Sequence, residues 1–356
     1  MTRLPFLFLA IICLGAGVLS GLVRAGVSVP LSLIAHPELH SLLMISGFFG
    51  TVIGLERAVA IRKRWAYLAP LLSALGGFVL LTNVPQSLAA LLFMLAGLCF
   101  VLATIRVVLL QPAIYTATLL TGAVLWLLGN IGWLISGAPW VSIPYGLSFL
   151  VMTIAGERLE LTRFLPLRPL ASAVFMVIAL FMLGGTFIAG ASDFDNNTLL
   201  GLSYGMLGLW LIRYDIARKT IHKSGITRFV AVCLLSGYGW LLIGGILSTN
   251  VLQLGAFQRD AAIHAIALGF IFAMVIGHAP IIFPAVVRLA IPFSAIFYIP
   301  LSLINLGVLL RLAAALVSEP ALREIGAMIN AIGILSFILC ILLQVTRGRR
   351  QQRRSL

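Results

Sequence analysis

Residues 86–109 read QSLAALLFMLAGLCFVLATIRVVL, and Arg106 is the only charged residue in this stretch. A helix of about 20 such residues crosses the ~30 Å hydrocarbon core of a bilayer. Similar stretches recur along the chain, in which 61% of the 356 residues are hydrophobic and 10% are charged. Soluble domains carry about 25% charged residues. The sequence therefore predicts an all-α, polytopic membrane protein, and its long uninterrupted apolar runs exclude the alternating pattern of a β-barrel.

The apolar stretches predict about twelve transmembrane helices. They cover residues 4–23, 37–58, 65–82, 86–109, 112–135, 141–161, 168–190, 197–213, 228–248, 260–284, 293–314 and 322–345. Because the connections are short, we expect residues 1–346 to form a single transmembrane domain, followed by a basic cytoplasmic tail at 347–356. The first apolar run is longer than the usual core of a signal peptide, which favours an uncleaved helix.

The basic residues predict the orientation of these helices. Of the 24 Lys and Arg residues, 24 − 4 = 20 fall on the side of the N-terminus, leaving Arg24, Arg259, Arg311 and Arg323 on the other. The positive-inside rule then places both termini in the cytoplasm, beneath a bacterial plasma (inner) membrane. The net charge of +14 sits at helix ends, which indicates contact with anionic lipids and argues against a nucleic-acid partner.

Three of the predicted helices, 37–58, 141–161 and 260–284, resemble one another. Each has a phenylalanine eight positions before a polar residue near its cytoplasmic end, namely Phe48 and Glu56, Phe149 and Glu157, and Phe270 and His278. Because these helices are four apart in the order of spans, the pattern favours three four-helix units around a pseudo-threefold axis. The alternative is chance, since glycine and phenylalanine are common in membrane helices.

Glu56 and Glu157 each precede an arginine at the edge of the hydrocarbon region. Ionisable groups at this depth are costly and usually face the protein interior or water. Two interpretations follow, a structural ion pair at a helix end or a path for protons, and we favour the structural one.

Four of the five histidines fall in just two predicted helices; the fifth, His222, lies in a basic loop. His36 and His40 are spaced i and i+4, which would place them on one helical face. His264 lies at a similar depth near the outer surface. His278 follows 14 residues later, about 21 Å deeper and within about 40° of the same face of a regular α-helix.

Neutral imidazole is a good ligand for haem iron and for copper. A haem between two helices takes one histidine from each, which His40 and His264 satisfy in depth, and His278 is a further candidate cofactor ligand. A copper ion could use His36, His40 and His264. Asp260, one turn before His264, would either orient that imidazole or cap the helix start. The four cysteines form no CxxCH or zinc pattern, so a haem would be held without covalent bonds, as haem b.

These features resemble two related groups of proteins. Twelve helices with histidines on the second and tenth are similar to the layout of haem–copper oxidase subunit I. The string His36-Pro37-Glu38-Leu39-His40 resembles the histidine-rich second helix of NnrS-type haem and copper membrane proteins. His264-Ala265 and Gly277-His278 resemble the late His-Ala and Gly-His elements of that family. The resemblance implies haem, with copper as a second metal, and a link to nitric oxide metabolism.

The chain also departs from these groups. The oxidase copper centre needs histidines on the sixth and seventh helices, and this sequence has none there. The two histidines of the second helix are four apart rather than two as in the NnrS pattern. Haem ligation is therefore carried over only to His40 and His264.

Three functions remain open at this point. The first is a haem-binding membrane protein in nitric oxide or redox stress metabolism, with respiratory-chain or denitrification proteins as partners. The second is a multi-pass transporter, because broken helices, acidic residues within apolar segments and internal repeats are also transporter features. The third is a factor that delivers metal or haem to a respiratory oxidase. Whether the chain is an enzyme stays undecided.

Overall fold

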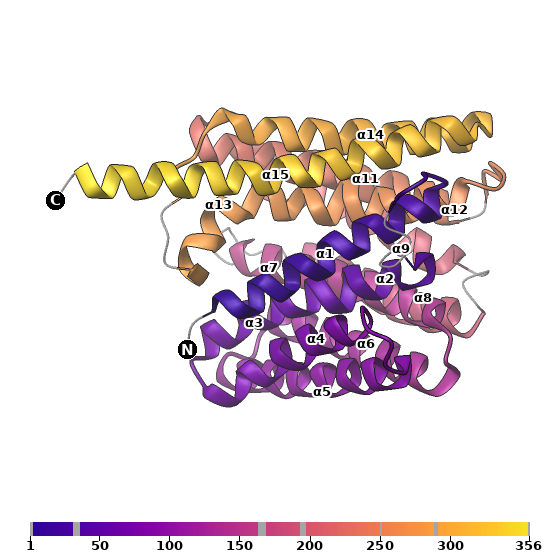
Figure 1. The fold of residues 1–356 in the computed structure, drawn as a ribbon, viewed down its shortest axis with the longest axis horizontal. Helices are drawn as coiled ribbons and strands as arrows, with labels where there is room; N and C mark the ends of the chain where they lie inside the picture. The colour runs from indigo at the N-terminus through magenta and orange to yellow at the C-terminus, as the bar shows by residue number, and fades with distance from the viewer. Residues whose placement is uncertain are drawn as a thin grey trace. The chain divides into compact units, whose positions relative to one another are not determined.

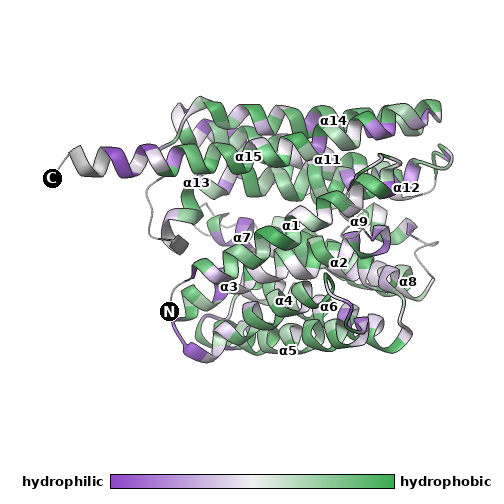
Figure 2. Cartoon of the chain, viewed as in Figure 1, coloured by the Kyte–Doolittle hydropathy of each residue, from purple (hydrophilic) through white to green (hydrophobic). Residues whose placement is uncertain are grey.

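The computed structural model describes residues 3–30, 36–162, 169–192, 197–249, 251–287 and 291–354. These residues form helices and connecting turns, and no β-strand occurs among them. Ten of the helices are long and apolar enough to cross a membrane. Figure 2 shows the helices as hydrophobic over most of their length. The chain is thus a multi-pass helical membrane protein, as the sequence predicts.

The chain divides into two compact units. The first unit covers Met1–Pro166 and Thr186–Asn196, and the second covers Leu167–Gly185 and Asn197–Leu356. Helix α8 (Pro169–Ala191) contributes residues to both.

The first unit contains the helices α1 to α7 of Figure 1. Their bounds are α1 Leu4–Ala25, α2 His40–Leu42, α3 Thr51–Ile61, α4 Leu68–Val79, α5 Gln86–Leu110, α6 Ile114–Ser136 and α7 Ser142–Thr162. A 3-10 turn (Pro37–Leu39) leads into α2, and a π-helical segment (Leu43–Gly50) joins α2 to α3. The centre of the unit is aromatic, with Trp126 stacked on Phe149 at 5.2 Å and Phe100 edge-on to both.

The second unit contains most of α8 and the helices α9 to α15. Their bounds are α9 Thr198–Tyr214, α10 Ala217–Thr220, α11 Gly225–Ser248, α12 Gln258–His264, α13 Ala273–Val287, α14 Tyr298–Val317 and α15 Pro320–Arg354. A second π-helical segment (Ala265–Phe272) joins α12 to α13. Helix α15 continues through the predicted cytoplasmic tail as far as Arg354, so most of the tail is an extension of the last helix.

Each of the twelve predicted spans falls on a helix, but two of these helices are short. The span predicted at 65–82 is α4 with a preceding 3-10 turn (Arg64–Tyr67), and the span predicted at 197–213 is α9, with 17 residues. The other ten are the helices that meet the length and hydropathy needed for a membrane crossing.

The two π-helical segments lie at equivalent positions of the predicted repeat. The pairs Phe48/Phe270 and Glu56/His278 differ by 222 in residue number, and the segments Leu43–Gly50 and Ala265–Phe272 differ by the same 222 at both ends. The helices before them, α1 and α11, agree within one residue of that offset. A π-helix is rare, so its recurrence in register supports a common origin for these two stretches. The third predicted copy, in α7, is α-helical throughout.

Candidate functional site

His40 is the first residue of α2, three residues before the π-helical segment starts at Leu43. Its Nδ1 lies 2.7 Å from the carbonyl oxygen of Gly17 in α1. Gly21, one turn further along α1, leaves room for the ring, because a Cβ there would come within 2.7 Å of the His40 Cε1 atom. The half-buried imidazole is therefore held against α1 by a hydrogen bond and by close packing.

His264 is the last residue of α12 and directly precedes the second π-helical segment. Its Nδ1 lies 2.8 Å from the backbone oxygen of Asp260 and 3.4 Å from the Oδ1 atom of the same residue. The sequence left open whether Asp260 orients this imidazole or caps the helix start, and in the structure the two residues are in contact. The backbone carbonyl makes the shorter of the two approaches.

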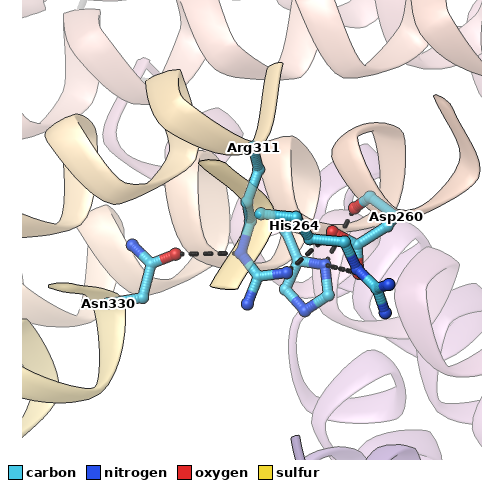
Figure 3. A network of polar contacts seen from close by, with 5 residues as sticks. Asp260, His264, Arg311 and Asn330 are labelled. Carbon is cyan, nitrogen blue, oxygen red and sulfur yellow. Dashed lines mark hydrogen bonds and ion pairs between the residues drawn. The ribbon is translucent and has the colours of Figure 1, made fainter. Parts of the chain in front are cut away.

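Asp260 is in turn held by two arginines of the second unit. Arg311 of α14 donates from Nη1 to Asp260 Oδ2 at 2.7 Å, and the Nε of Arg323 lies 3.8 Å from Oδ1. Arg311 also donates from Nε to Asn330 Oδ1 at 3.1 Å, and Asn330 donates to the backbone oxygen of Ile304 at 3.0 Å. Figure 3 shows this chain of contacts running from α15 through α14 to His264.

His278 lies deeper in the second unit, in α13. Its Nδ1 is 2.8 Å from the backbone oxygen of Met274, one turn earlier in the same helix. The sequence placed its ring near the His264 face by assuming a continuous α-helix. The π-helical segment between them contradicts that assumption, because i→i+5 bonding turns each residue by less than 100°. The predicted offset of about 40° between the two faces is therefore wrong.

The three histidines share one chemical feature. A carbonyl oxygen only accepts hydrogen bonds, so each Nδ1 carries the proton and each neutral ring has its lone pair on Nε2. Histidines that bind metals usually donate their other ring N–H to a carbonyl or carboxylate in this way. In its neutral form, each ring is thus in the tautomer required for ligation through Nε2.

His36 does not share a helical face with His40. It has an extended backbone (φ −87°, ψ 112°) and precedes the 3-10 turn that starts at Pro37. The i and i+4 relation of the two residues therefore carries no α-helical geometry, and that prediction is wrong. Its side chain is exposed. Across the described ranges, no group of three or more His, Cys, Asp or Glu side chains is arranged to hold a metal ion.

The two predicted acidic sites belong together in the first unit. The charged groups that act on Glu157 include Glu56, Arg57, Arg158 and Glu160, so the ends of α3 and α7 form one charged cluster. Arg158 is buried, with 4% of its surface exposed. A mixture of acids and arginines at helix ends fits the structural interpretation of these residues.

Arg311, Arg323 and Asn330 belong to this network but were not predicted as site residues from the sequence. Arg311 and Arg323 were counted only as charges on the outer side. The sequence does indicate that Arg311 has a partner, because this arginine falls inside an apolar run, where it is costly unless it is paired. Arg311 is 5% exposed and Asn330 2% exposed, so both are interior residues.

A search of the curated proteins gives no significant match to this sequence. The family described as "Domain of unknown function (DUF8744)" matches residues 3–346. That range begins just before α1 and ends within α15, so it takes in both units and every residue of the candidate site. The protein therefore belongs to the DUF8744 family.

Proposed function

We propose that the chain is a haem-binding membrane protein, with His40, His264 and His278 as the candidate axial ligands. The observation that carries the proposal is their shared tautomer, in which a backbone carbonyl fixes Nδ1–H and leaves the lone pair on Nε2. His264 also directly precedes a π-helical segment, and His40 lies three residues before the other one, a distortion often found at functional sites.

Haem suits these residues better than a bare copper ion. A haem supplies four nitrogen ligands of its own and needs only one or two imidazoles from the protein. A copper ion held by protein alone needs several converging ligands. Copper at His36, His40 and His264 remains part of the proposal as a second metal. Bound haem would supply redox and gas-binding chemistry, and the resemblance to NnrS-type proteins directs it towards nitric oxide or redox stress.

The proposal includes twelve crossings of a bacterial inner membrane, with both termini in the cytoplasm. Helix α4 with its 3-10 turn, and helix α9, span about 24 Å and 26 Å, which a bilayer accommodates by local thinning. Counting both as crossings keeps 20 of the 24 basic residues on one side. The proposal also includes three four-helix units around a pseudo-threefold axis, and the repeated π-helical register supports the equivalence of two of them.

The optical spectrum of the full chain, purified in detergent from haem-replete cells, tests the proposal directly. We expect a Soret band and a pyridine haemochrome of haem b. Replacement of a ligand histidine by alanine should abolish or shift the band, and separate His40→Ala, His264→Ala and His278→Ala variants identify the ligands. His222→Ala, in the basic loop, is the control and should leave the band unchanged. A colourless, metal-free protein would refute haem binding.

A pair of glycine variants in α1 tests the packing around the His40 ring without substituting the histidine itself. Gly21→Ala places a methyl group within 2.7 Å of the His40 ring, whereas Gly15→Ala meets no atom within 4 Å. If His40 is a ligand, Gly21→Ala should displace its ring and shift the Soret maximum. Gly15→Ala should retain the parent spectrum. Identical spectra for both variants would remove His40 from the ligand set.

A transporter is the second candidate, and the internal repeat favours it. Transporters are often built from repeats and from helices interrupted near the substrate site, and here Pro280 and Pro284 lie within α13. Substrate-dependent uptake into vesicles by a colourless protein would support this alternative. A factor that delivers haem or metal to an oxidase would instead copurify with the oxidase subunit and transfer its cofactor.

A further inference from the structure

The polar network of the second unit has hydrogen-bonding capacity that its own residues do not use. Arg311 has five N–H donors. Among the described residues it donates two hydrogen bonds, from Nε to Asn330 and from Nη1 to Asp260. The side chain is nevertheless 95% buried, since only 5% of its surface is exposed. Its second amino group, Nη2, makes neither of these hydrogen bonds and is not among the fully enclosed side-chain atoms without a partner, so part of it reaches the surface and is open to a ligand.

The charges around Arg311 indicate the sign of that acceptor. Two guanidinium groups, those of Arg311 and Arg323, contact the single carboxylate of Asp260. His264 approaches the other side of the same carboxylate, at Oδ1. The cluster is therefore rich in positive charge and donors, a composition that suits an anion and disfavours a cation.

The position of the cluster makes it reachable from one end of the helices. Asp260 is the third residue of α12, Arg323 is the fourth of α15, and Arg311 lies six residues before the end of α14. Six residues correspond to about 9 Å of helix. All three residues lie within about two turns of the same helix ends, so a small solute can approach without crossing the unit.

We propose that Arg311 is the anchor of a binding site for a small oxyanion of carboxylate or phosphate type. The planar guanidinium presents paired donors that match two oxygen atoms of such a group. Asp260 and Asn330 hold the guanidinium in place through its Nη1 and Nε atoms, which leaves its other amino group to bind the ligand. The site does not depend on haem, and it goes beyond the function proposed above.

The test is isothermal titration of the full chain in detergent with sodium acetate and, separately, inorganic phosphate, each against sodium chloride of equal ionic strength. We expect saturable binding in the millimolar range. Arg311→Gln should weaken it about tenfold or more, as expected for loss of a charged hydrogen bond. Arg218→Gln, which alters an exposed arginine of the α10 segment, is the matched control and should bind like the parent.

Arg311→Gln leaves Asp260 without its closest partner and can unfold the unit. Two further variants keep the test decisive. Asp260→Asn/Arg311→Gln removes both charges, and Asn330→Asp places a carboxylate against Arg311 to compete with the ligand. Both should weaken binding about tenfold. Parent-like affinity in a folded variant of either kind would overturn the proposal, as would the absence of saturable binding of both probes to the parent.

Separate measurements identify the source of the anion and test the haem proposal. Binding of acetate in excess of phosphate indicates a soluble carboxylate. Preference for phosphate, with loss of binding in nanodiscs that contain phosphatidylglycerol, indicates a lipid headgroup. The haem content of each preparation is measured before titration. Acetate or phosphate binding to a protein without a Soret band supports the anion site and refutes the haem proposal. A Soret band in a protein that binds neither acetate nor phosphate supports the haem proposal and refutes the anion site.

Discussion

Replacing Ser46 by alanine should destabilise the first unit measurably, because this hydroxyl ties the segment Leu43–Gly50 to helix α6 through two hydrogen bonds. Ser46 Oγ donates to Asn130 Oδ1 at 3.1 Å and accepts from Trp126 Nε1 at 3.0 Å. All three side chains are buried. Hydrogen bonds between transmembrane helices contribute about 0.6 kcal/mol on average and up to about 1.7 kcal/mol. Loss of two such bonds should therefore lower the free energy of unfolding by about 1–3 kcal/mol.

The assay is reversible unfolding in mixed micelles of increasing SDS content. Ser203→Ala is the matched control, because Ser203 is also fully buried but donates only to the Leu200 oxygen of its own helix. It should cost about 0.5 kcal/mol or less, since that carbonyl keeps its helical partner. The double variant Ser46→Ala/Trp126→Phe should show a coupling of at least about 0.5 kcal/mol. Equal losses for Ser46→Ala and Ser203→Ala would refute the reasoning.

Three further predictions use the same unfolding assay. Gly201→Ala should lower the free energy of unfolding by about 1–3 kcal/mol, because its methyl group would lie 2.6 Å from the Gly245 oxygen. The control Gly239→Ala meets no atom within 4 Å and should cause no loss. Similar losses for the two variants would contradict the packing of α9 on α11. Asn330→Leu removes the acceptor of Arg311 Nε and should cost about 1–3 kcal/mol, so a neutral result would show that the Asn330 contact is dispensable. Trp240→Phe removes the 2.6 Å hydrogen bond to Asn305 and should cost about 1 kcal/mol beyond the change in packing, which the coupling to Asn305→Ala would measure.

The helices were largely predictable because apolar length is a local property of the sequence. Every predicted span coincides with a helix, within a few residues at most ends. The span predicted at 65–82 extends past the end of α4 because it includes the turn residues Leu80, Leu81 and Thr82, which are as apolar or as small as helix residues. The division into two compact units was not predicted, because it depends on packing between distant helices.

The candidate site was predictable only where its residues are close in sequence. The Asp260 and His264 pair follows from an i and i+4 spacing, and the structure confirms it. Arg311 and Asn330 come from two other helices, and no spacing rule joins them to Asp260. An unpaired arginine in an apolar run is costly, so the sequence implies that Arg311 has a partner. Only the fold identifies that partner as Asp260.

The π-helical segments were not predicted either, since wider hydrogen bonding reflects packing rather than composition. The phenylalanine and glycine pairs at 47–48 and 269–270 nevertheless mark equivalent places within them. The repeat was therefore detected from side chains, whereas its most specific common feature lies in the backbone. The π-helical segment Ala265–Phe272 also explains why the predicted angle between the faces of His264 and His278 is wrong.

The shared register of the two π-helical segments also bears on the order in which the two stretches diverged. If both descend from one ancestral segment, that segment already contained the distortion, and the side chains around it changed afterwards. Ser46 against Leu268 and Glu56 against His278 are then substitutions accumulated on an inherited backbone. One copy kept a polar tie between helices and an acid at its end, while the other acquired an imidazole. Under such a duplication, the two copies would differ in their side chains while both retain the π-helical winding.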